Sequence, residues 1–423
     1  MSSPAPPALR RGAAWLAVAL AWSLPVSLFG MQAAAIAGGL LVLWGVARHR
    51  GAALEPSPLD LPMLALLAAY GLSLLLAPRP PTSLQTATSF WVMSACLVAR
   101  AGLTRSVDLR RALVGLLGLA SLAGLFGLFQ CLTGLYPGAG WLHPQVAAPL
   151  QPAPGAPGLS GAVGLFFSRL TFAHALLFPL CWSVALCLWP PTPRWRWPCA
   201  LAALASAAGL GASFTRAAWV AGALALMGLG LARLRAGRSR RWALGAAAAL
   251  LLAGAAALPF LPARLTSAFA GSHDWGRLAL WHTALDLAAE RPLTGVGYGN
   301  FQRDAAERIE ARRVEVGARR FPGTIAWAHS HGLTFLAETG LLGLAAWVWL
   351  FVAYFRAARA RLRAGAGGDP LRAAFLRGSL AAVAAFLVIG LAHDAFFDGE
   401  VAFALWFCLG ASLAGGRAGE GAC

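Results

Sequence analysis

Long apolar stretches constrain this chain more than any other feature of its sequence. Apolar residues make up 59% of the 423 residues and charged residues only 12%, whereas about a quarter of a soluble domain is charged. Successive apolar runs of roughly 17–25 residues, each long enough to cross a bilayer as a helix, fill most of the length. The sequence therefore predicts an all-α polytopic integral membrane protein.

Twelve transmembrane helices are predicted from these runs. They lie near residues 13–29, 32–47, 61–77, 84–99, 112–134, 170–190, 198–213, 217–232, 243–260, 332–355, 378–393 and 401–416. Residues 1–260 would form a bundle of nine spans with a Pro/Gly-rich outer loop over 135–169. A large polar loop over 261–331 follows, and residues 332–423 would supply spans ten to twelve and a C-terminal tail.

The basic residues define the expected topology. All 34 are arginine, and they give a net charge of +18, which could indicate a nucleic-acid partner. They alternate between successive loops instead, with 22 on one face of the predicted bundle and 12 on the other. The positive-inside rule makes the richer face cytoplasmic, with both termini inside and an uncleaved first span. Topology thus accounts for the charge, and no nucleic-acid partner is expected.

Two amphipathic helices are predicted within the polar loop. The first covers 272–289, where an apolar stripe recurs at helical spacing through Leu278, Trp281, Leu285 and Ala288. A glycine-rich turn over Gly295–Asn300 separates it from the second helix over 301–316, with Asn300 as the N-cap and a stripe of Phe301, Ala305 and Ile309. We expect the pair to lie on the outer surface and to roof a cavity.

Two arginines and two histidines are the main candidates for chemistry. Arg216 lies at the outer mouth of a span and Arg277 borders the apolar stripe of the first surface helix. Paired guanidinium groups suit the oxygens of a pyrophosphate, although each could instead anchor a helix end. His331 opens span ten and could act as a general base near neutral pH, with His329 as a second polar ligand.

Further candidates surround these residues. Glu338 lies two helical turns beyond His331, at a depth where a carboxylate needs a partner, so an arginine or histidine is expected beside it. Gly297 and Asn300 belong to the glycine-rich turn, whose backbone amides could approach a substrate. Arg169 could touch a lipid phosphate, although core or interface packing is the better explanation for it. The histidine pair lacks a third ligand at a sensible spacing, and the seven cysteines form no framework, so no metal is expected.

The motifs of this region resemble those of the O-antigen ligase superfamily of bacterial membrane glycosyltransferases. The resemblance covers roughly a third of the chain. It rests on Ser213-Phe-Thr-Arg216, Trp275-Gly-Arg277, Trp281, Arg291-Pro-Leu-Thr-Gly-Val-Gly-Tyr-Gly-Asn-Phe301, His329-Ser-His331 and Ala337-Glu-Thr-Gly-Leu-Leu-Gly343. The twelve-span plan with a large outer loop between late spans is also typical of this superfamily.

The resemblance implies a metal-independent, cofactor-free glycosyl transfer at the periplasmic face of the bacterial inner membrane. The donor would be a glycan on undecaprenyl pyrophosphate, and the acceptor lipid A–core or another glycan. Arg216 and Arg277 match the arginines proposed to hold the pyrophosphate, and His331 matches the histidine proposed to activate the acceptor hydroxyl. Transfer would invert the anomeric carbon. Gly332 stands where the family usually has asparagine, which leaves His329 as an alternative base.

Three activities compete with an O-antigen ligase. A polymerase or a protein O-oligosaccharyltransferase of the same superfamily would share these motifs. A transporter of lipid-linked sugars would place charged residues at mid-membrane along its pathway. The predicted spans are almost free of such charges and no internal repeat is evident, so the sequence favours an enzyme.

Overall fold

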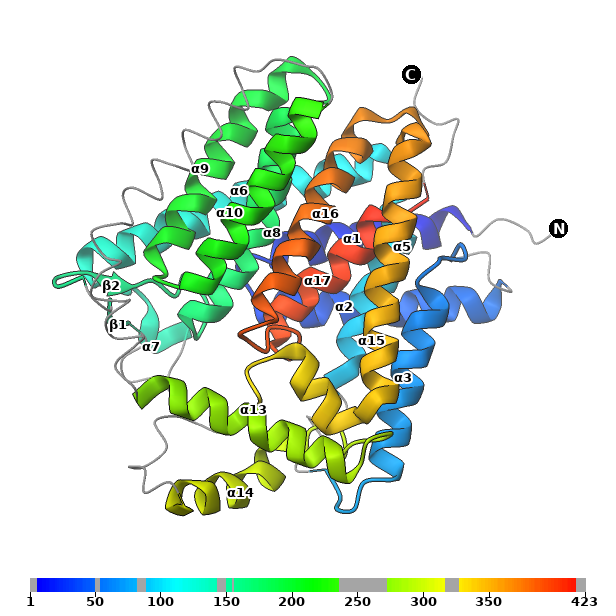
Figure 1. Cartoon of the computed structure of the whole chain (residues 1–423). Helices are drawn as coiled ribbons and strands as arrows, with labels where there is room; N and C mark the ends of the chain where they lie inside the picture. The colour runs from blue at the N-terminus through cyan, green and yellow to red at the C-terminus, as the bar shows by residue number, and fades with distance from the viewer. Residues whose placement is uncertain are drawn as a thin grey trace.

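The computed structural model describes residues 6–49, 54–81, 89–142, 150–153, 156–235, 272–315 and 327–415. Within these ranges the chain is almost entirely helical (Figure 1). The described strands are the short antiparallel pair β1 (Gln151–Pro152) and β2 (Ser160–Gly161), in the loop expected to be irregular. The fold is therefore all-α, as the apolar runs predicted.

The helices form one bundle with two helices across one end (Figure 1). The bundle contains α1 (Pro7–Ser23), α2 (Leu28–Arg48), α3 (Asp60–Leu75), η1 (Ser89–Met93), α5 (Ser94–Gly102), α6 (Ser106–Thr133), α8 (Arg169–Leu188), α9 (Arg196–Ala212), α10 (Arg216–Arg235), α15 (His331–Arg363), α16 (Pro370–Ile389) and α17 (Gly399–Ser412). Short helices α7 (Ala139–Leu142), η2 (Pro193–Trp195) and η4 (Gly365–Gly368) lie in connections. The crossing pair is α13 (Ser272–Glu290) and α14 (Phe301–Glu315).

Six of the described helices are long and apolar enough to cross a membrane. They are α2, α6, α8, α10, α15 and α16. Helices also lie at the other predicted span positions, except that the ninth span over 243–260 falls outside the described residues. The chain is a multi-pass membrane protein, and the total of twelve spans stays a prediction.

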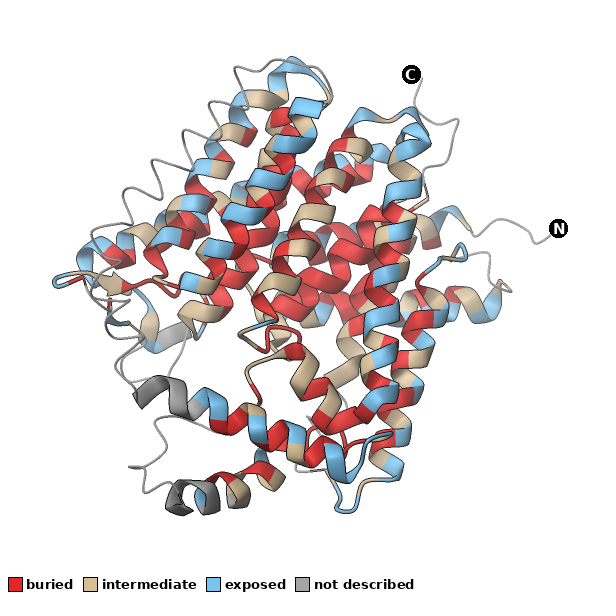
Figure 2. Ribbon diagram, in the orientation of Figure 1, coloured by how far each residue is buried: buried red, intermediate tan, exposed pale blue. Residues whose placement is uncertain are grey.

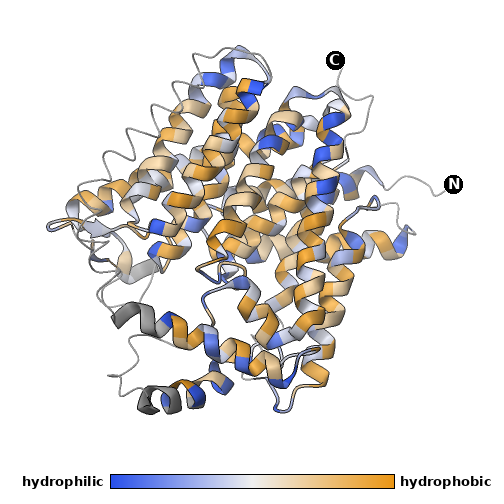
Figure 3. Cartoon of the chain, viewed as in Figure 1, coloured by the Kyte–Doolittle hydropathy of each residue, from blue (hydrophilic) through white to orange (hydrophobic). Residues whose placement is uncertain are grey.

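Burial differs sharply between the central and outer helices (Figure 2). Helix α8 is buried on nearly all sides, and its Trp182 packs between the rings of Phe375 and Phe407. The outer helices instead expose large apolar side chains such as Leu40 of α2 and Val220 of α10. Polar residues gather at the helix ends, so the middle turns of the helices form an apolar belt (Figure 3). Such a belt suits contact with lipid.

Helices α13 and α14 lie across the bundle end that faces away from the start of α1 and the end of α17 (Figure 1). In α14, the predicted stripe of Phe301, Ala305 and Ile309 is fully buried. Of the predicted α13 stripe, Ala288 is buried, whereas Leu278 and Leu285 are 51% and 47% exposed. The buried face is offset along the helix and contains Leu280, Ala284 and Leu287, which pack in one cluster with the α14 stripe. Helix α13 is apolar on more than one face, so periodicity alone could not select the packed one.

Helix α15 is broken at Gly340, whereas the sequence predicts a continuous span over 332–355. Gly340 has φ 64° and ψ −163°, a conformation open essentially to glycine alone. The break frees the carbonyls of Ala337 and Glu338 and the N–H groups of Leu341 and Leu342, which would pair with each other in an unbroken helix.

The glycine-rich segment after α13 takes up all four freed groups. The N–H groups of Val296 and Gly297 donate to the carbonyls of Ala337 (2.9 Å) and Glu338 (3.0 Å). In return, the N–H groups of Leu341 and Leu342 donate to the carbonyls of Pro292 (2.8 Å) and Leu293 (3.3 Å). We call this set of four bonds the α15 clasp. A Cβ atom on Gly340 would overlap the backbone of Leu293, and one on Gly295 would overlap that of Glu338. Close approach of two backbones therefore requires glycine at both positions.

We predict that Gly340→Ala lowers the free energy of unfolding by about 1–3 kcal/mol, because alanine tolerates neither this backbone conformation nor the overlap with Leu293. The measurement is the thermal unfolding midpoint of the detergent-purified protein. Gly332→Ala is the matched control, since a Cβ there meets no atom within 4 Å. Equal midpoints for the two variants would refute the proposed need for glycine.

Candidate functional site

Two neighbouring helices each begin with an arginine at the bundle end that faces α13. Arg169 is the first residue of α8 and Arg216 the first residue of α10. The hydroxyl of Thr215 donates to the Arg169 carbonyl at 3.4 Å, which ties the two helix starts together. Their guanidinium groups are close enough for the two positive charges to interact. Two positive charges are thus held side by side.

Arg277 of α13 adds a third positive charge, and two histidines lie near it. Burial and then the charge of Arg277 lower the pKa of His329. Burial lowers the pKa of His393 to about 4, with further contributions from Arg277, His329 and Arg169. These shared electrostatic effects place Arg169, Arg216, Arg277, His329 and His393 in one arginine–histidine cluster. Both imidazoles are neutral at pH 7.

The backbone at His329 is held in an unusual conformation by Asp394. His329 has φ 53°, a left-handed value that is uncommon outside glycine. The Asp394 carboxylate accepts the hydroxyl of Thr334 at 2.8 Å. The backbone N–H groups of His329 and Ser330 lie near enough to stabilise its ionised form. Asp394, in the loop between α16 and α17, therefore fixes where the His329 side chain leaves the backbone.

His331 occupies a different environment from His329. It is fully buried, and its ring packs against those of Phe386 (4.9 Å), Trp347 (6.0 Å) and Phe396 (6.2 Å). Its Nε2 accepts the backbone N–H of Phe396 at 2.9 Å, so the lone pair of that nitrogen is occupied. The backbone N–H of His331 donates to the Gly390 carbonyl at 2.8 Å. His331 thereby joins the start of α15 to both ends of the segment that carries His393.

Gly390 lies directly against the His331 ring. A Cβ atom at this position would overlap the imidazole at Nδ1. That Nδ1 is buried without a hydrogen-bond partner. The contacts described for His331 are thus structural ones.

Glu338, Gly297 and Asn300 all belong to the packed region around the α15 clasp. The Glu338 carboxylate accepts the N–H of Phe301 at 3.1 Å, at the start of α14. The expected arginine or histidine partner is not found among the described residues. The backbone contact uses Oε1, and Oε2 is buried without a hydrogen-bond partner. Asn300 is fully buried and donates to the carbonyls of Arg79 and Val296, each at 3.2 Å. No described contact brings these three residues to the arginine–histidine cluster.

Sequence reasoning missed His393 and Asp394. They follow the end of α16 and lie about sixty residues after His329. A histidine and an aspartate in a short connection between two apolar runs were a usable signal, because polar residues at span ends often mark function. Nothing local indicated that this connection would fold back onto the start of α15. His174 of α8 is also buried there, with its ring 5.3 Å from that of His393.

The arrangement suits an anionic ligand and a proton transfer beside it. Neither Arg169 nor Arg277 forms an ion pair with a residue in the described ranges. Neighbouring guanidinium groups repel one another, and a phosphate or pyrophosphate would relieve this repulsion with paired hydrogen bonds. A neutral imidazole at the same cluster could accept a proton from a hydroxyl group.

Comparison with known protein families gives one match. The model of the O-antigen ligase family matches residues 201–348, which include Arg216, Arg277, His329 and His331. Arg169 and the 390–398 loop lie outside the matched region. A search of curated proteins found no match to the chain.

We predict that Asp394→Asn becomes more stable relative to the wild type as the pH rises from 5 to 8. Burial raises the pKa of Asp394 from 3.8 to about 7, so the folded protein holds a proton that the unfolded chain has lost. This stabilisation is present at low pH and is lost as the pH rises through 7, whereas asparagine stays neutral. Unfolding midpoints of both proteins across this range test the effect. A difference that does not change with pH would show that Asp394 does not titrate there.

We also predict that Arg277→Gln raises the pKa of His329, because a positive charge that disfavours the imidazolium is removed. The measurement is the pH dependence of His329 modification by diethyl pyrocarbonate, quantified by mass spectrometry. Arg277→Lys is the matched control and should leave the profile close to that of the wild type. Identical profiles for the glutamine and lysine variants would show that the charge at position 277 does not affect the pKa of His329.

Proposed function

Because the chain belongs to the O-antigen ligase superfamily, we propose that it is a glycosyltransferase of the bacterial inner membrane. In this proposal it moves a glycan from undecaprenyl pyrophosphate to an acceptor hydroxyl at the periplasmic face. The acceptor is lipid A–core, which makes the protein an O-antigen ligase. The lipid-linked donor and the acceptor would reach the site from the bilayer.

The observation that carries the proposal is the convergence of Arg169, Arg216 and Arg277 beside two neutral histidines. A pyrophosphate leaving group gains negative charge as the glycosidic bond breaks. Arginines already fixed at that position stabilise this charge without further reorganisation, which is often the largest contribution to catalysis. Arg216 and Arg277 are assigned to the pyrophosphate, and Arg169 joins them as a third cationic contact.

His329 is the better candidate for the general base. The sequence favoured His331, but the Nε2 of His331 accepts a backbone N–H inside an aromatic cage. His329 is only partly buried and shares the cluster with Arg277. Its lowered pKa keeps the imidazole neutral and able to accept a proton at pH 7.

The reaction follows from these assignments. His329 removes the proton from the acceptor hydroxyl as the oxygen attacks the anomeric carbon. The bond between that carbon and the pyrophosphate oxygen breaks, and the carbon inverts. Undecaprenyl pyrophosphate leaves with the bonding electron pair, stabilised by the arginines. No metal or cofactor takes part in this scheme.

The deciding experiment is transfer by the purified full chain in detergent. The assay supplies undecaprenyl-pyrophosphate-linked glycan and lipid A–core, with EDTA present, and compares the wild type with His329→Gln and His331→Gln. We expect His329→Gln to lower the rate about 100-fold or more with an unchanged unfolding midpoint. We expect His331→Gln to lower the midpoint, with activity retained by the folded fraction.

Each other outcome changes a specific part of the proposal. Loss of activity only in His331→Gln, at an unchanged midpoint, would make His331 the base. Longer glycans on the carrier lipid, without a lipid A–core product, would make the protein a polymerase. Transport of the lipid-linked glycan without transfer, unaffected by either variant, would overturn the enzyme proposal.

A further inference from the structure

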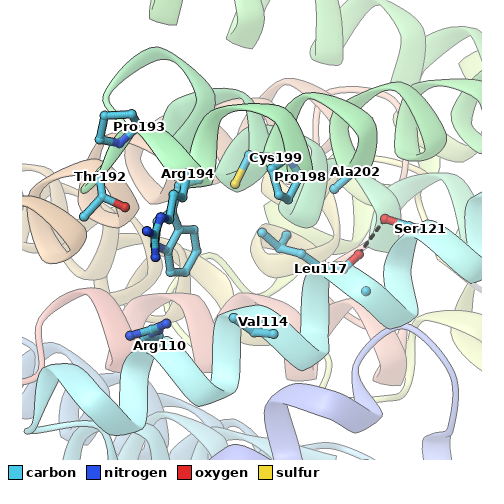
Figure 4. Close-up of a pocket in the computed structure, with 12 residues that line it drawn as sticks. Arg110, Val114, Leu117, Ser121, Thr192, Pro193, Arg194, Pro198, Cys199 and Ala202 are labelled. Atoms are coloured by element: carbon cyan, nitrogen blue, oxygen red, sulfur yellow. Dashed lines mark hydrogen bonds between the residues drawn. The ribbon is translucent and has the colours of Figure 1, made fainter.

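A second charged feature lies at the opposite end of α9 from Arg216. Between α6 and the start of α9 there is a pocket of about 730 Å³, which we call the α6–α9 pocket (Figure 4). Arg110 of α6 and Arg194 of η2 lie at one end of it, across from each other. Helix α9 has 17 residues, so about 25 Å separates its start, next to Arg194, from its end near Arg216.

The pocket exists because α6 and α9 touch near their far ends and diverge toward the two arginines. At the contact, a Cβ atom on Gly209 would lie 2.7 Å from the Cα of Gly124, so the backbones meet directly. Nearer the arginines, a Cβ atom on Gly118 would meet no atom within 4 Å. A trough that narrows away from the charged end results.

The walls of the trough are apolar and its mouth is cationic. Val114, Leu117 and Pro198 line the interior. At the mouth, Arg110 and Arg194 are exposed, and neither forms an ion pair with any residue that the structure describes. No acidic residue lines the pocket, while the Trp195 ring and the Thr192 hydroxyl complete its rim. The cationic mouth therefore suits the charged group of an amphipathic anion, and the apolar interior suits its hydrocarbon chain.

We propose that the α6–α9 pocket binds an anionic phospholipid, with the phosphate between Arg110 and Arg194 and one acyl chain in the trough. Guanidinium groups form paired hydrogen bonds with phosphate oxygens, and basic pockets between transmembrane helices recognise anionic headgroups. The trough adds apolar burial that free phosphate could not gain. A net negative headgroup is preferred because the mouth carries two cations and no anion.

This site is independent of the proposed transferase chemistry. It occupies the arginine-rich face, predicted to be cytoplasmic, and a lipid of the adjoining leaflet can enter the trough sideways. Because α9 leads directly from this pocket to the start of α10, a bound lipid would stabilise the position of α9, the helix that precedes Arg216. Binding of the lipid can be measured without any activity assay.

The test is native mass spectrometry of the full chain in detergent with phosphatidylglycerol, phosphatidylcholine or inorganic phosphate. We expect phosphatidylglycerol to bind best, and the double variant Arg110→Gln/Arg194→Gln to bind it roughly 25-fold more weakly, from about a fivefold loss per arginine. Arg48→Gln is the matched control, because Arg48 is an exposed arginine at the end of α2, outside the pocket.

A second pair of variants tests the trough without touching the arginines. Gly118→Leu should fill the space and weaken phosphatidylglycerol binding. Gly228→Leu on α10, where a Cβ atom also meets nothing within 4 Å, should leave binding unchanged. Equal binding of the two lipids, or equal affinity of the double variant and Arg48→Gln, would overturn the proposal. Binding of inorganic phosphate as tight as that of the lipid would overturn the role of the trough.

Discussion

The candidate site depends on a reciprocal attachment between the start of α15 and the 390–398 loop. His331 reaches from α15 into that loop, bonding to Gly390 and Phe396. Asp394, from the loop, accepts the hydroxyl of Thr334 and lies near the N–H groups of His329 and Ser330. Each segment thus orients the other. Since polar groups buried without partners are costly, neither segment can move far without breaking several of these bonds.

The break in α15 provides a second constraint. A continuous helix would satisfy its own backbone groups, and the segment after α13 would then lose the four hydrogen bonds of the clasp. Gly340 releases four of these groups to the glycine-rich segment, while Glu338 meets the start of α14. The α15 clasp therefore fixes the crossing helices against the bundle. In this way it positions Arg277 without contacting it.

Arginines serve two separate purposes in this chain. Those on the richer face follow the distribution expected from membrane topology, and two of them define the mouth of the α6–α9 pocket. Those at the other end are fewer, but helix starts and a crossing helix bring three of them together. The same residue type is thus spread over one face and concentrated on the other, and the concentrated group lowers the pKa values of His329 and His393.

The sequence by itself determined the helical membrane class, most helix positions and the match to the O-antigen ligase family, and it marked Arg216 and Arg277 as candidates. These properties follow from local composition, periodicity and short motifs. The tertiary structure decided which face of α13 packs, that α15 breaks at Gly340, and that Glu338 caps a helix instead of pairing with an arginine. It also decided how His329 and His331 differ, although they are two residues apart. Their environments are set by Asp394 and Phe396, about sixty residues away, and no local pattern encodes a contact between such distant segments.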